Sequence, residues 1–370
     1  MKVAFFAYDL SESSGWGRYT VQILKRMAGQ GIEPIVFSIR GSGGNPALAG
    51  IPHYPILRSY RDGAGKAAFV LLDYLSIRGK IRECQALHCF VEPFLPLASL
   101  LAGRDKKLFA SAVGTYSIQT LKTPWWGWWY RRSFLKCRRI LAISRYTGAR
   151  LAGALHGTAD KILAVPLGVE MDGHRTHPPA AARESAFMTV GEIKPRKGVL
   201  EAVQAFGKVV KNHPLARFYI VGLDSPSAYV EKIKKVIEQS GLKENVIWKG
   251  RVSQAELDAL YSRVRGFVLP SLNVDDQFEG FGLVHLEANA LGLPAIGSSD
   301  CGNEDAILDG KSGFLVGQGD ISGLAAAMEK LLDPAYPWDE LARSAVAFAR
   351  SMDWEKPSRR YAETFLGIPG

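Results

Sequence analysis

Two glutamates with seven residues between them, Glu279 and Glu287, lie in a segment that also contains Gly280 and Gly282. The segment follows a predicted strand, and a helix is predicted to begin near Leu283. Glycines let the backbone approach a ligand closely, and the amino end of a helix attracts a phosphate. A carboxylate on that helix can accept two hydrogen bonds from a vicinal diol such as a ribose. The segment therefore predicts a site for a phosphorylated sugar; the alternative is that both acids are simply solvated.

A pair of cations, Arg196 and Lys197, occupies a loop between a predicted strand and a predicted helix in the segment VGEIKPRKG. A nucleoside diphosphate gains negative charge as it leaves a sugar, and a fixed Arg or Lys lowers the barrier to that step. The pair therefore predicts a catalytic role for both residues. The alternative is an exposed basic loop without a function.

The first half of the chain offers further candidates. In SGWGRYT, Gly15 and Gly17 free the backbone ahead of a helix, where it would meet a diphosphate, and Arg18 is a candidate ligand for a phosphate or an acceptor. His88 and Glu92 lie at the end of another predicted strand and are candidate acceptor-binding or catalytic groups that would face the ligand. The alternative for His88 is a structural role.

The elements that would position these residues alternate between strand and helix. In the first half, strands are predicted at Val3–Ala7, Pro34–Ile39, Ala86–Phe90, Leu108–Ala112 and Ile140–Ile143. In the second half, strands are predicted at Ala186–Val190, Phe218–Val221, Val246–Lys249, Gly266–Leu269 and Ala295–Gly297, with helices between them. This alternation, in a chain of 370 residues, predicts an α/β protein with two facing, doubly wound, Rossmann-like domains.

The same motifs resemble those of the family-four retaining glycosyltransferases (glycosyl transferases group 1) of the GT-B fold, over nearly the whole chain. The resemblance is carried by the Glu279–Glu287 segment, VGEIKPRKG, VIWKGRVSQAELDALY and DGKSGFLV, and more loosely by SGWGRYT, LAISRYT and VPLGVE. It implies an acceptor-side domain over residues 1–178 and a nucleotide-sugar-binding domain over residues 179–350. It also implies a final helix over residues 351–370 that crosses back onto the first domain.

The resemblance further implies a role for each site residue. Glu287 would hold the nucleotide ribose, and Glu279 would contact the hydroxyls of the donor sugar. The backbone amides of Phe281, Gly282 and Leu283 would line the sugar and the diphosphate. Ser271 precedes an insertion, residues 272–278, that is similar to one in mannosyltransferases acting on lipid acceptors.

Two positions depart from the family pattern. Glu192 stands where many relatives have an Arg, and Val113 stands where many have a His. A front-face mechanism, in which the leaving phosphate takes the proton of the acceptor, would need no base from the protein. The chain has no Asp-x-Asp after a strand and no P-loop, so we expect no metal and no cofactor. The donor would be a UDP- or GDP-linked hexose.

The whole net charge of +10 arises in one stretch, because Lys106 to Ala159 contains ten basic residues and no Asp or Glu. A helix is predicted there, with Thr123 as N-cap, Pro124 as first residue, and Arg132, Lys136 and Arg139 on one face. The residues expected to bind an anionic membrane surface are Trp125, Trp128, Trp129, Arg131, Arg132 and Lys136. The alternatives are packing of the tryptophans in the core and binding of single-stranded nucleic acid, for which no fold signature is present.

These observations predict a hexosyltransferase of polysaccharide or glycolipid biosynthesis that uses a nucleotide sugar and a glycan or lipid-linked acceptor. We expect a cytoplasmic protein, peripheral on the inner face of the cell membrane and without nucleic acid as a partner. The amino terminus becomes charged too early for a signal peptide, and no apolar run reaches the ~20 residues of a spanning helix. The alternatives are a sugar-nucleotide epimerase of similar two-lobed fold, and a membrane- or nucleic-acid-binding module with a vestigial site.

Overall fold

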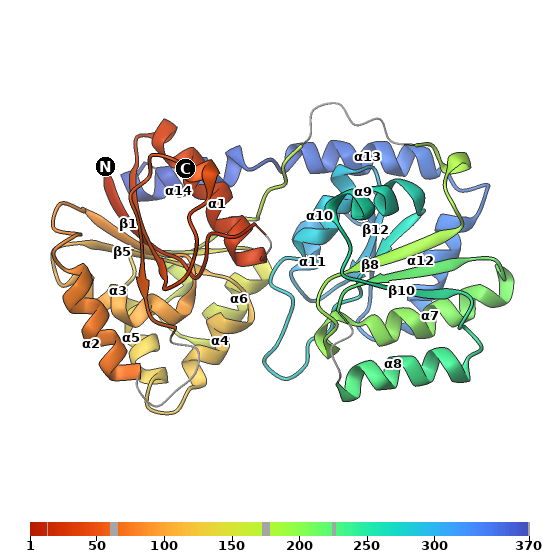
Figure 1. Ribbon diagram of the computed structural model, residues 1–370, viewed down its shortest axis with the longest axis horizontal. Coiled ribbons are helices and arrows are strands. Elements are labelled where there is room, and N and C mark those ends of the chain that lie inside the picture. Colours follow the sequence, from red (N-terminus) through yellow and green to blue (C-terminus); the bar gives the residue numbers. More distant parts are fainter. Residues whose placement is uncertain (13, 60–65, 172–177, 224–226, 369–370) are drawn as a thin grey trace. The chain divides into compact units, whose positions relative to one another are not determined.

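The computed structural model describes residues 1–12, 14–59, 66–171, 178–223 and 227–368, which form two compact units (Figure 1). The first unit comprises residues 1–167 and 354–370, and the second comprises residues 168–353. The predicted limits were 178 and 351, so the first boundary lies earlier in the chain and the second lies later. The reason is that Val169 pairs with Asp353 and donates its backbone N–H to the Met352 carbonyl at 2.8 Å, which holds both segments on the second unit.

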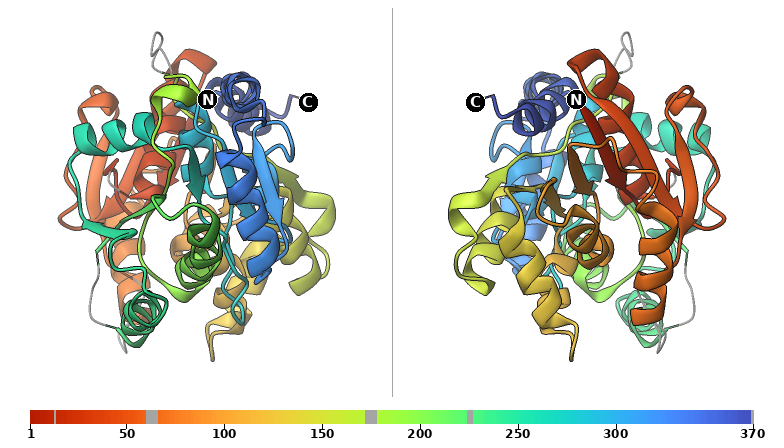
Figure 2. Two further views of the ribbon diagram at one scale, coloured as in Figure 1. Left: turned by 90° about the vertical axis from the view of Figure 1, so that its right-hand side faces the viewer. Right: turned by 90° about the vertical axis from the view of Figure 1, so that its left-hand side faces the viewer.

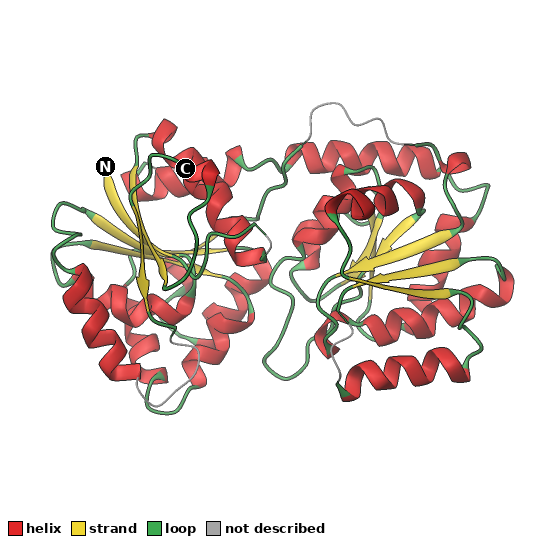
Figure 3. Cartoon of the chain, in the orientation of Figure 1, coloured by secondary structure: helices red, strands yellow, loops and turns green. Residues whose placement is uncertain are grey.

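The described part of the first unit contains one parallel sheet with the strand order β3-β2-β1-β4-β5-β6-β7 (Figure 3). Its strands are β1 Lys2–Phe6, β2 Glu33–Ile39, β3 His53–Leu57, β4 Ala86–Cys89, β5 Lys107–Ala112, β6 Arg139–Ala142 and β7 Ile162–Ala164. The order reverses between β1 and β4, which are neighbours in the sheet. The buried apolar residues of β1, β2 and β4 explain why these strands form the centre.

Helices cover both faces of this sheet (Figures 1 and 2). They are α1 Gly15–Met27, α2 Lys66–Ile77, α3 Leu95–Ala102, α4 Thr115–Lys122, α5 Gly127–Lys136, α6 Arg145–Ala154 and α14 Glu355–Leu366. The C-terminal helix α14 packs beside α1. Its Tyr361 hydroxyl lies 3.0 Å from Ser111 Oγ and hydrogen-bonds the Tyr19 hydroxyl, and all three groups are buried. Helix α14 is therefore an integral part of the first unit.

The second unit repeats the architecture with the strand order β10-β9-β8-β11-β12-β13. Its strands are β8 Ala186–Val190, β9 Arg217–Val221, β10 Val246–Gly250, β11 Gly266–Val268, β12 Ala295–Ser298 and β13 Gly313–Val316. Its helices are α7 Val199–Asn212, α8 Ala228–Gln239, α9 Gln254–Arg263, α10 Leu283–Ala290, α11 Asn303–Ala306, α12 Ile321–Leu332 and α13 Trp338–Ser351. Here the order reverses between β8 and β11, and the expected α/β fold class is confirmed for both units.

Candidate active site

The predicted site residues of the second unit gather where its strand order reverses. Arg196 and Lys197 follow β8, and Ser271 and Glu279 follow β11, which pairs with β8 in the sheet. In open α/β sheets, ligands bind outside the carboxyl ends of the strands at such a reversal point. Residues about 80 positions apart in the sequence therefore reach one place because the fold brings two neighbouring strand ends together.

Glu279 is the centre of this cluster. Its Oε2 accepts hydrogen bonds from Lys197 Nζ at 2.5 Å and from Arg196 Nη1 at 3.0 Å, and Ser271 Oγ lies 3.5 Å away. Glu279 and Ser271 are buried, whereas the two cations keep part of their surface exposed. One carboxylate therefore holds two cations in fixed positions, and the three side chains together carry a net positive charge.

The environment of Glu279 keeps its carboxylate ionised. Burial alone would raise its pKa, but Lys197 and Arg196 outweigh burial and lower the pKa to about 2. A group of this kind acts as a permanent anion at any physiological pH and does not donate protons. Glu279 therefore suits hydrogen bonding to sugar hydroxyls and orientation of the cations, and does not suit acid catalysis.

Two glycines allow the loops of this site to come close together. Gly198, at φ 65°, lies so near the neighbouring loop that a Cβ there would come 1.9 Å from the Pro270 carbonyl oxygen. The same two loops are joined by the hydrogen bond from Leu272 N to Arg196 O at 2.8 Å. At Gly282, with φ 87°, a Cβ would lie 2.3 Å from Asn303 Nδ2. Both positions therefore require glycine.

Helix α10 begins directly after Gly282 and supplies the anion-attracting end of the site. Its first backbone N–H groups have no partner within the helix, and its dipole is positive at this end. Phe281 is buried and Leu283 is half-buried. Glu287 lies one turn along the helix and is half-buried. The geometry suits a diphosphate at the helix end and a diol at Glu287.

Two residues that support the loop before α10 were not predicted from the sequence. His285 lies below the site with Nδ1 3.1 Å from the Gly282 carbonyl and Nε2 3.2 Å from the Leu269 carbonyl, so it joins the end of β11 to α10. Burial lowers the pKa of His285 to about 4, so the ring is neutral and only one of its two nitrogens donates to a carbonyl. Asn303 accepts from Ser298 N at 3.2 Å and donates to the Phe281 carbonyl at 3.4 Å. His285 lies within the recognised motif, whereas nothing in the sequence singled out Asn303.

The unusual Glu192 does not join the cluster. It is exposed and forms an ion pair with Lys194 at 2.7 Å, while Arg196 occupies the position against Glu279. The cation of this loop that contacts Glu279 beside Lys197 is thus Arg196, four residues after Glu192.

In the first unit, the glycines of SGWGRYT lie inside α1 and not ahead of it, which corrects our prediction. Ser14 caps the helix by accepting from Gly17 N at 2.9 Å, so the helix begins at Gly15. A Cβ at Gly17 would lie 2.0 Å from the Ser11 carbonyl oxygen, whereas Gly15 has open space around it. Arg18 is half-buried and its guanidinium donates to the Glu12 carbonyl at 3.2 Å.

His88 lies in the core of the first unit, and the expectation that it faces a ligand is wrong. Its ring has no exposed surface and contacts Phe5, Phe90, Tyr361 and Phe365. Its Nε2 lies 3.0 Å from Ser111 Oγ, and burial lowers its pKa to about 3. The apolar residues around β4 and α14 explain this structural role.

Glu92 is also buried, at the start of a short turn after β4. Its Oε1 accepts from Val113 N at 2.8 Å and from the Ser117 hydroxyl. Burial raises the pKa of Glu92 to about 7. The carboxyl thus fixes the backbone at Val113, where many relatives carry the His, and at the start of α4.

The tryptophan-rich stretch differs from the predicted helix. Thr123 ends α4, and α5 begins only at Gly127, because the chain turns at Trp125 with φ 63°. Arg139 lies in β6 and shares no helical face with Arg132 and Lys136. A Cβ at Gly127 would lie 2.4 Å from the Leu121 carbonyl oxygen, so the start of α5 requires a glycine.

The side chains of this stretch divide into two groups. Trp125 and Trp128 are 96% and 69% exposed, and the exposed Arg132 lies 5.8 Å from the Trp128 ring centroid. Trp129 is half-buried and stacks on Trp126 at 5.3 Å, so it does not belong to the exposed group. Arg131 and Lys136 are exposed.

The described residues contain neither a candidate metal cluster nor a helix that could span a membrane. No group of three His, Cys, Asp or Glu side chains there could hold a metal ion. Within the same residues, no helix has the length and apolar character needed to cross a bilayer.

Comparisons with known proteins agree with this description. Residues 13–172 match the family model described as Glycosyltransferase Family 4, and residues 174–352 match Glycosyl transferases group 1. The chain is 32% identical over 243 residues to a D-inositol 3-phosphate glycosyltransferase of Acidothermus cellulolyticus, covering 62% of this chain and 52% of that one. It is 29% identical over 207 residues to a GDP-mannose-dependent alpha-(1-6)-phosphatidylinositol monomannoside mannosyltransferase of Mycolicibacterium smegmatis, covering 53% of each. The chain thus spans about half the length of these curated relatives.

Two solved structures resemble the fold. HepE of Anabaena, crystallised with UDP and glucose, aligns with a TM-score of 0.78 at 17% identity over 99% of this chain and 100% of that one. The lipopolysaccharide outer core galactosyltransferase WaaB aligns with a TM-score of 0.76 at 17% identity over 100% of both chains. These likenesses identify the fold as GT-B.

Proposed function

Because the chain belongs to the glycosyltransferases that join a Glycosyltransferase Family 4 domain to a Glycosyl transferases group 1 domain, we propose that it is a retaining hexosyltransferase. The donor is a nucleoside diphosphate sugar, and the acceptor is a glycan or a lipid-linked saccharide. The observation that carries the proposal is the buried Glu279 holding Lys197 and Arg196 beside the amino end of α10. That arrangement matches what a departing diphosphate requires.

Each part of the donor has a partner in the proposed complex. The N–H groups of Gly282 and Leu283 and the cations Arg196 and Lys197 bind the diphosphate, and Glu279 binds hydroxyls of the hexose. Glu287 accepts from the ribose diol, which its place one turn into α10 supports. Ser271 Oγ lies 3.5 Å from Glu279 Oε2 and helps to hold the carboxylate in place.

The proposed reaction proceeds on one face of the sugar. The bond between the anomeric carbon and the β-phosphate oxygen breaks, and its electron pair goes to that oxygen. The acceptor hydroxyl then bonds to the anomeric carbon from the same side and gives its proton to the leaving phosphate. Lys197 and Arg196 neutralise the charge that develops, so the proposed mechanism requires neither a metal ion nor a basic side chain at Val113.

We also propose which nucleotide sugar is the donor. One relative is named as GDP-mannose-dependent, and one structural neighbour was crystallised with UDP and glucose. We therefore propose GDP-mannose first and UDP-glucose second. Hydrolysis of a panel of UDP-, GDP- and ADP-linked hexoses in the absence of acceptor measures this directly, and turnover of none of them contradicts the proposed function.

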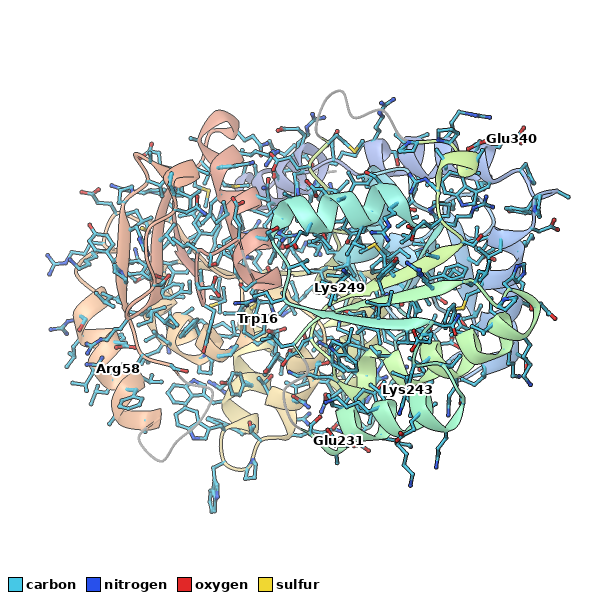
Figure 4. The ribbon with its side chains drawn as sticks, turned by 45° about the vertical axis from the view of Figure 1, so that its right-hand side comes forward. Trp16, Arg58, Glu231, Lys243, Lys249 and Glu340 are labelled. Atoms are coloured by element: carbon cyan, nitrogen blue, oxygen red, sulfur yellow. The ribbon has the colours of Figure 1, made fainter. Side chains whose placement is uncertain are left out.

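Replacing Glu287 with Ala tests the ribose contact. We expect the affinity for the nucleoside diphosphate to fall about 10- to 100-fold, because two hydrogen bonds to a charged acceptor are lost. Isothermal titration calorimetry measures this affinity. Glu231→Ala on α8 is the control, because Glu231 is an exposed helical glutamate of the same unit (Figure 4). Unchanged affinity in Glu287→Ala would remove the ribose role.

We further propose that the protein works on the cytoplasmic face of the cell membrane, bound peripherally through Trp125 and Trp128. Their exposure beside Arg131, Arg132 and Lys136 supports this proposal, since tryptophan and cations together favour an anionic interface. The double variant Trp125→Ser, Trp128→Ser should lower partition onto anionic vesicles about tenfold in a co-sedimentation assay. Leu215→Ser, on the second unit, is the control. Equal co-sedimentation of the tryptophan variant and wild type would contradict the proposal.

A further inference from the structure

Helix α2 has its apolar side turned outward. Leu71, Leu72 and Leu75 are 57%, 45% and 49% exposed, and Ala67 and Ala68 on the same side are exposed as well. We call the three leucines the α2 leucine row. A surface helix of a water-soluble protein normally turns such residues toward the core and its charges toward water. The α2 leucine row lies outside the tryptophan-rich stretch, so it is a second exposed apolar surface.

The orientation of α2 is fixed by its buried side. Asp73, the only acid of the helix, has no exposed surface; it forms an ion pair with Arg58 and accepts from Arg58 N at 3.0 Å. Val70 and Ile77 are buried on the same side. Rotating the helix to bury the leucine row would expose these residues and break the ion pair. The fold therefore fixes the outward orientation of the leucine row.

Neighbouring helices also carry exposed apolar residues. Helix α3 packs against both α2 and α5, and the three lie together on one face of the sheet (Figure 1). Each contributes an exposed apolar side chain: the α2 leucine row, Leu100 of α3, and Trp128 and Leu135 of α5. The three helices contain one acid, the buried Asp73, whereas Arg131, Arg132 and Lys136 of α5 are exposed.

We propose that α2 is a second membrane-binding element, and that its leucine row enters the apolar boundary of an anionic bilayer while the cations of α5 contact the headgroups. The inference rests on the proposed membrane association and adds a residue set to it. Charge selects this occupant over a second copy of the chain, because two copies joined by this face would place cations against cations. Exposed leucines beside tryptophan and arginine match the composition of interfacial helices.

A protein with two membrane-binding elements should lose vesicle binding differently from a protein with one. If the tryptophans alone held the protein on the membrane, the α2 leucine row would be dispensable. If both elements enter the bilayer, each set of substitutions should weaken binding separately, and removal of both should abolish it. The apolar area on α2 should also add binding that high salt cannot remove, since salt screens only the headgroup contacts.

The test replaces the leucine row by serine, in Leu71→Ser, Leu72→Ser, Leu75→Ser. These positions face water, so the variant should fold normally. Partition onto phosphatidylcholine vesicles containing phosphatidylglycerol should fall at least about tenfold relative to wild type. The matched control is Leu215→Ser, Leu223→Ser, Leu308→Ser, which removes three leucines of comparable exposure from the second unit and should bind as wild type does. Equal partition of the α2 variant and wild type would overturn the inference.

A second measurement reports on α2 itself and does not depend on a loss of binding. The four native cysteines are buried, so Leu72→Cys places one accessible thiol on α2 for an environment-sensitive dye. The emission should shift to the blue with anionic vesicles, whereas a dye at Leu215→Cys should not respond. A blue shift at Leu72→Cys without vesicles, together with a dimer in sedimentation that the triple serine variant abolishes, would overturn the inference in favour of a protein interface.

Hydrolysis of a donor sugar distinguishes a failure of this inference from a failure of the proposed transferase function. The triple serine variant should hydrolyse a soluble donor sugar at the wild-type rate, because α2 belongs to the first unit and the Glu279 cluster to the second. A protein that binds vesicles through α2 but hydrolyses no donor would contradict the proposed function and leave the inference standing. Normal donor hydrolysis together with vesicle binding that does not depend on α2 would overturn the inference and leave the proposed function standing.

Discussion

Replacing Lys197 with Ala should lower the rate of hexose transfer roughly 10²- to 10³-fold, because it removes a cation that stabilises the departing diphosphate. Lys197 Nζ is held 2.5 Å from Glu279 Oε2, so it is positioned before the donor binds and costs little to organise during the reaction. The charge on the diphosphate increases as the glycosidic bond breaks. The lost interaction therefore matters more in the transition state than in the bound donor.

The expected signature is a large fall in kcat with a smaller change in donor affinity. Steady-state kinetics with the best donor of the panel, combined with calorimetry of the nucleoside diphosphate, separates the two quantities. Lys194→Ala is the matched control, because Lys194 lies in the same loop, is about half exposed and pairs with the exposed Glu192. A turnover of Lys197→Ala close to that of Lys194→Ala would refute the catalytic role of Lys197.

The sequence predicted the second unit more completely than the first. Strands β8, β9, β10, β11 and β12 were all predicted to within one residue at each end, since each strand is a short apolar run bounded by polar residues. Strand β13 was missed as a strand, although its residues stood in the recognised segment DGKSGFLV. It lies at the edge of the sheet, where one neighbour is missing and the apolar pattern is weaker.

Edge position also explains the misses in the first unit. Strand β3 contains Pro55, a residue that removes a backbone donor and is tolerated only at the edge, and β7 has only three residues. Both lie at the ends of the sheet order. The predicted helix start at Thr123 was wrong for a different reason, because the chain turns at Trp125 with φ 63°, a conformation that the residue type does not indicate.

For the candidate site, the sequence predicted which residues matter but not how they pair. Glu279, Arg196 and Lys197 were each selected, yet their shared Oε2 contact depends on β8 and β11 being neighbours. His88 was selected because it lies at the end of a predicted strand, whereas its burial depends on α14, more than 260 residues later in the chain. Asn303 had no signal, since an Asn in a short helix has no distinctive local pattern.

Replacing Glu279 with Gln should lower turnover roughly 10²- to 10³-fold and also destabilise the second unit. The amide keeps the shape of the side chain but loses the charge that holds Lys197 and Arg196 together, so the two cations are left adjacent and poorly compensated. Loss of one member of a buried ion pair costs about 3 kcal/mol of unfolding free energy. Urea unfolding at neutral pH measures this cost.

The pH dependence gives the sharper test of the same substitution. Because the folded-state pKa of Glu279 is lowered to about 2 from an ordinary value of 4.5, its stabilisation is present in full above pH 4.5. It is lost as pH falls from 4.5 toward 2, so the difference in unfolding free energy between wild type and Glu279→Gln should shrink over that range. Glu238→Gln is the control, since Glu238 pairs with Lys243 at 2.6 Å but is exposed, and its effect should be small at every pH. A wild-type advantage over Glu279→Gln that stays constant from pH 7 to pH 3 would show that the carboxylate does not hold the two cations as we describe.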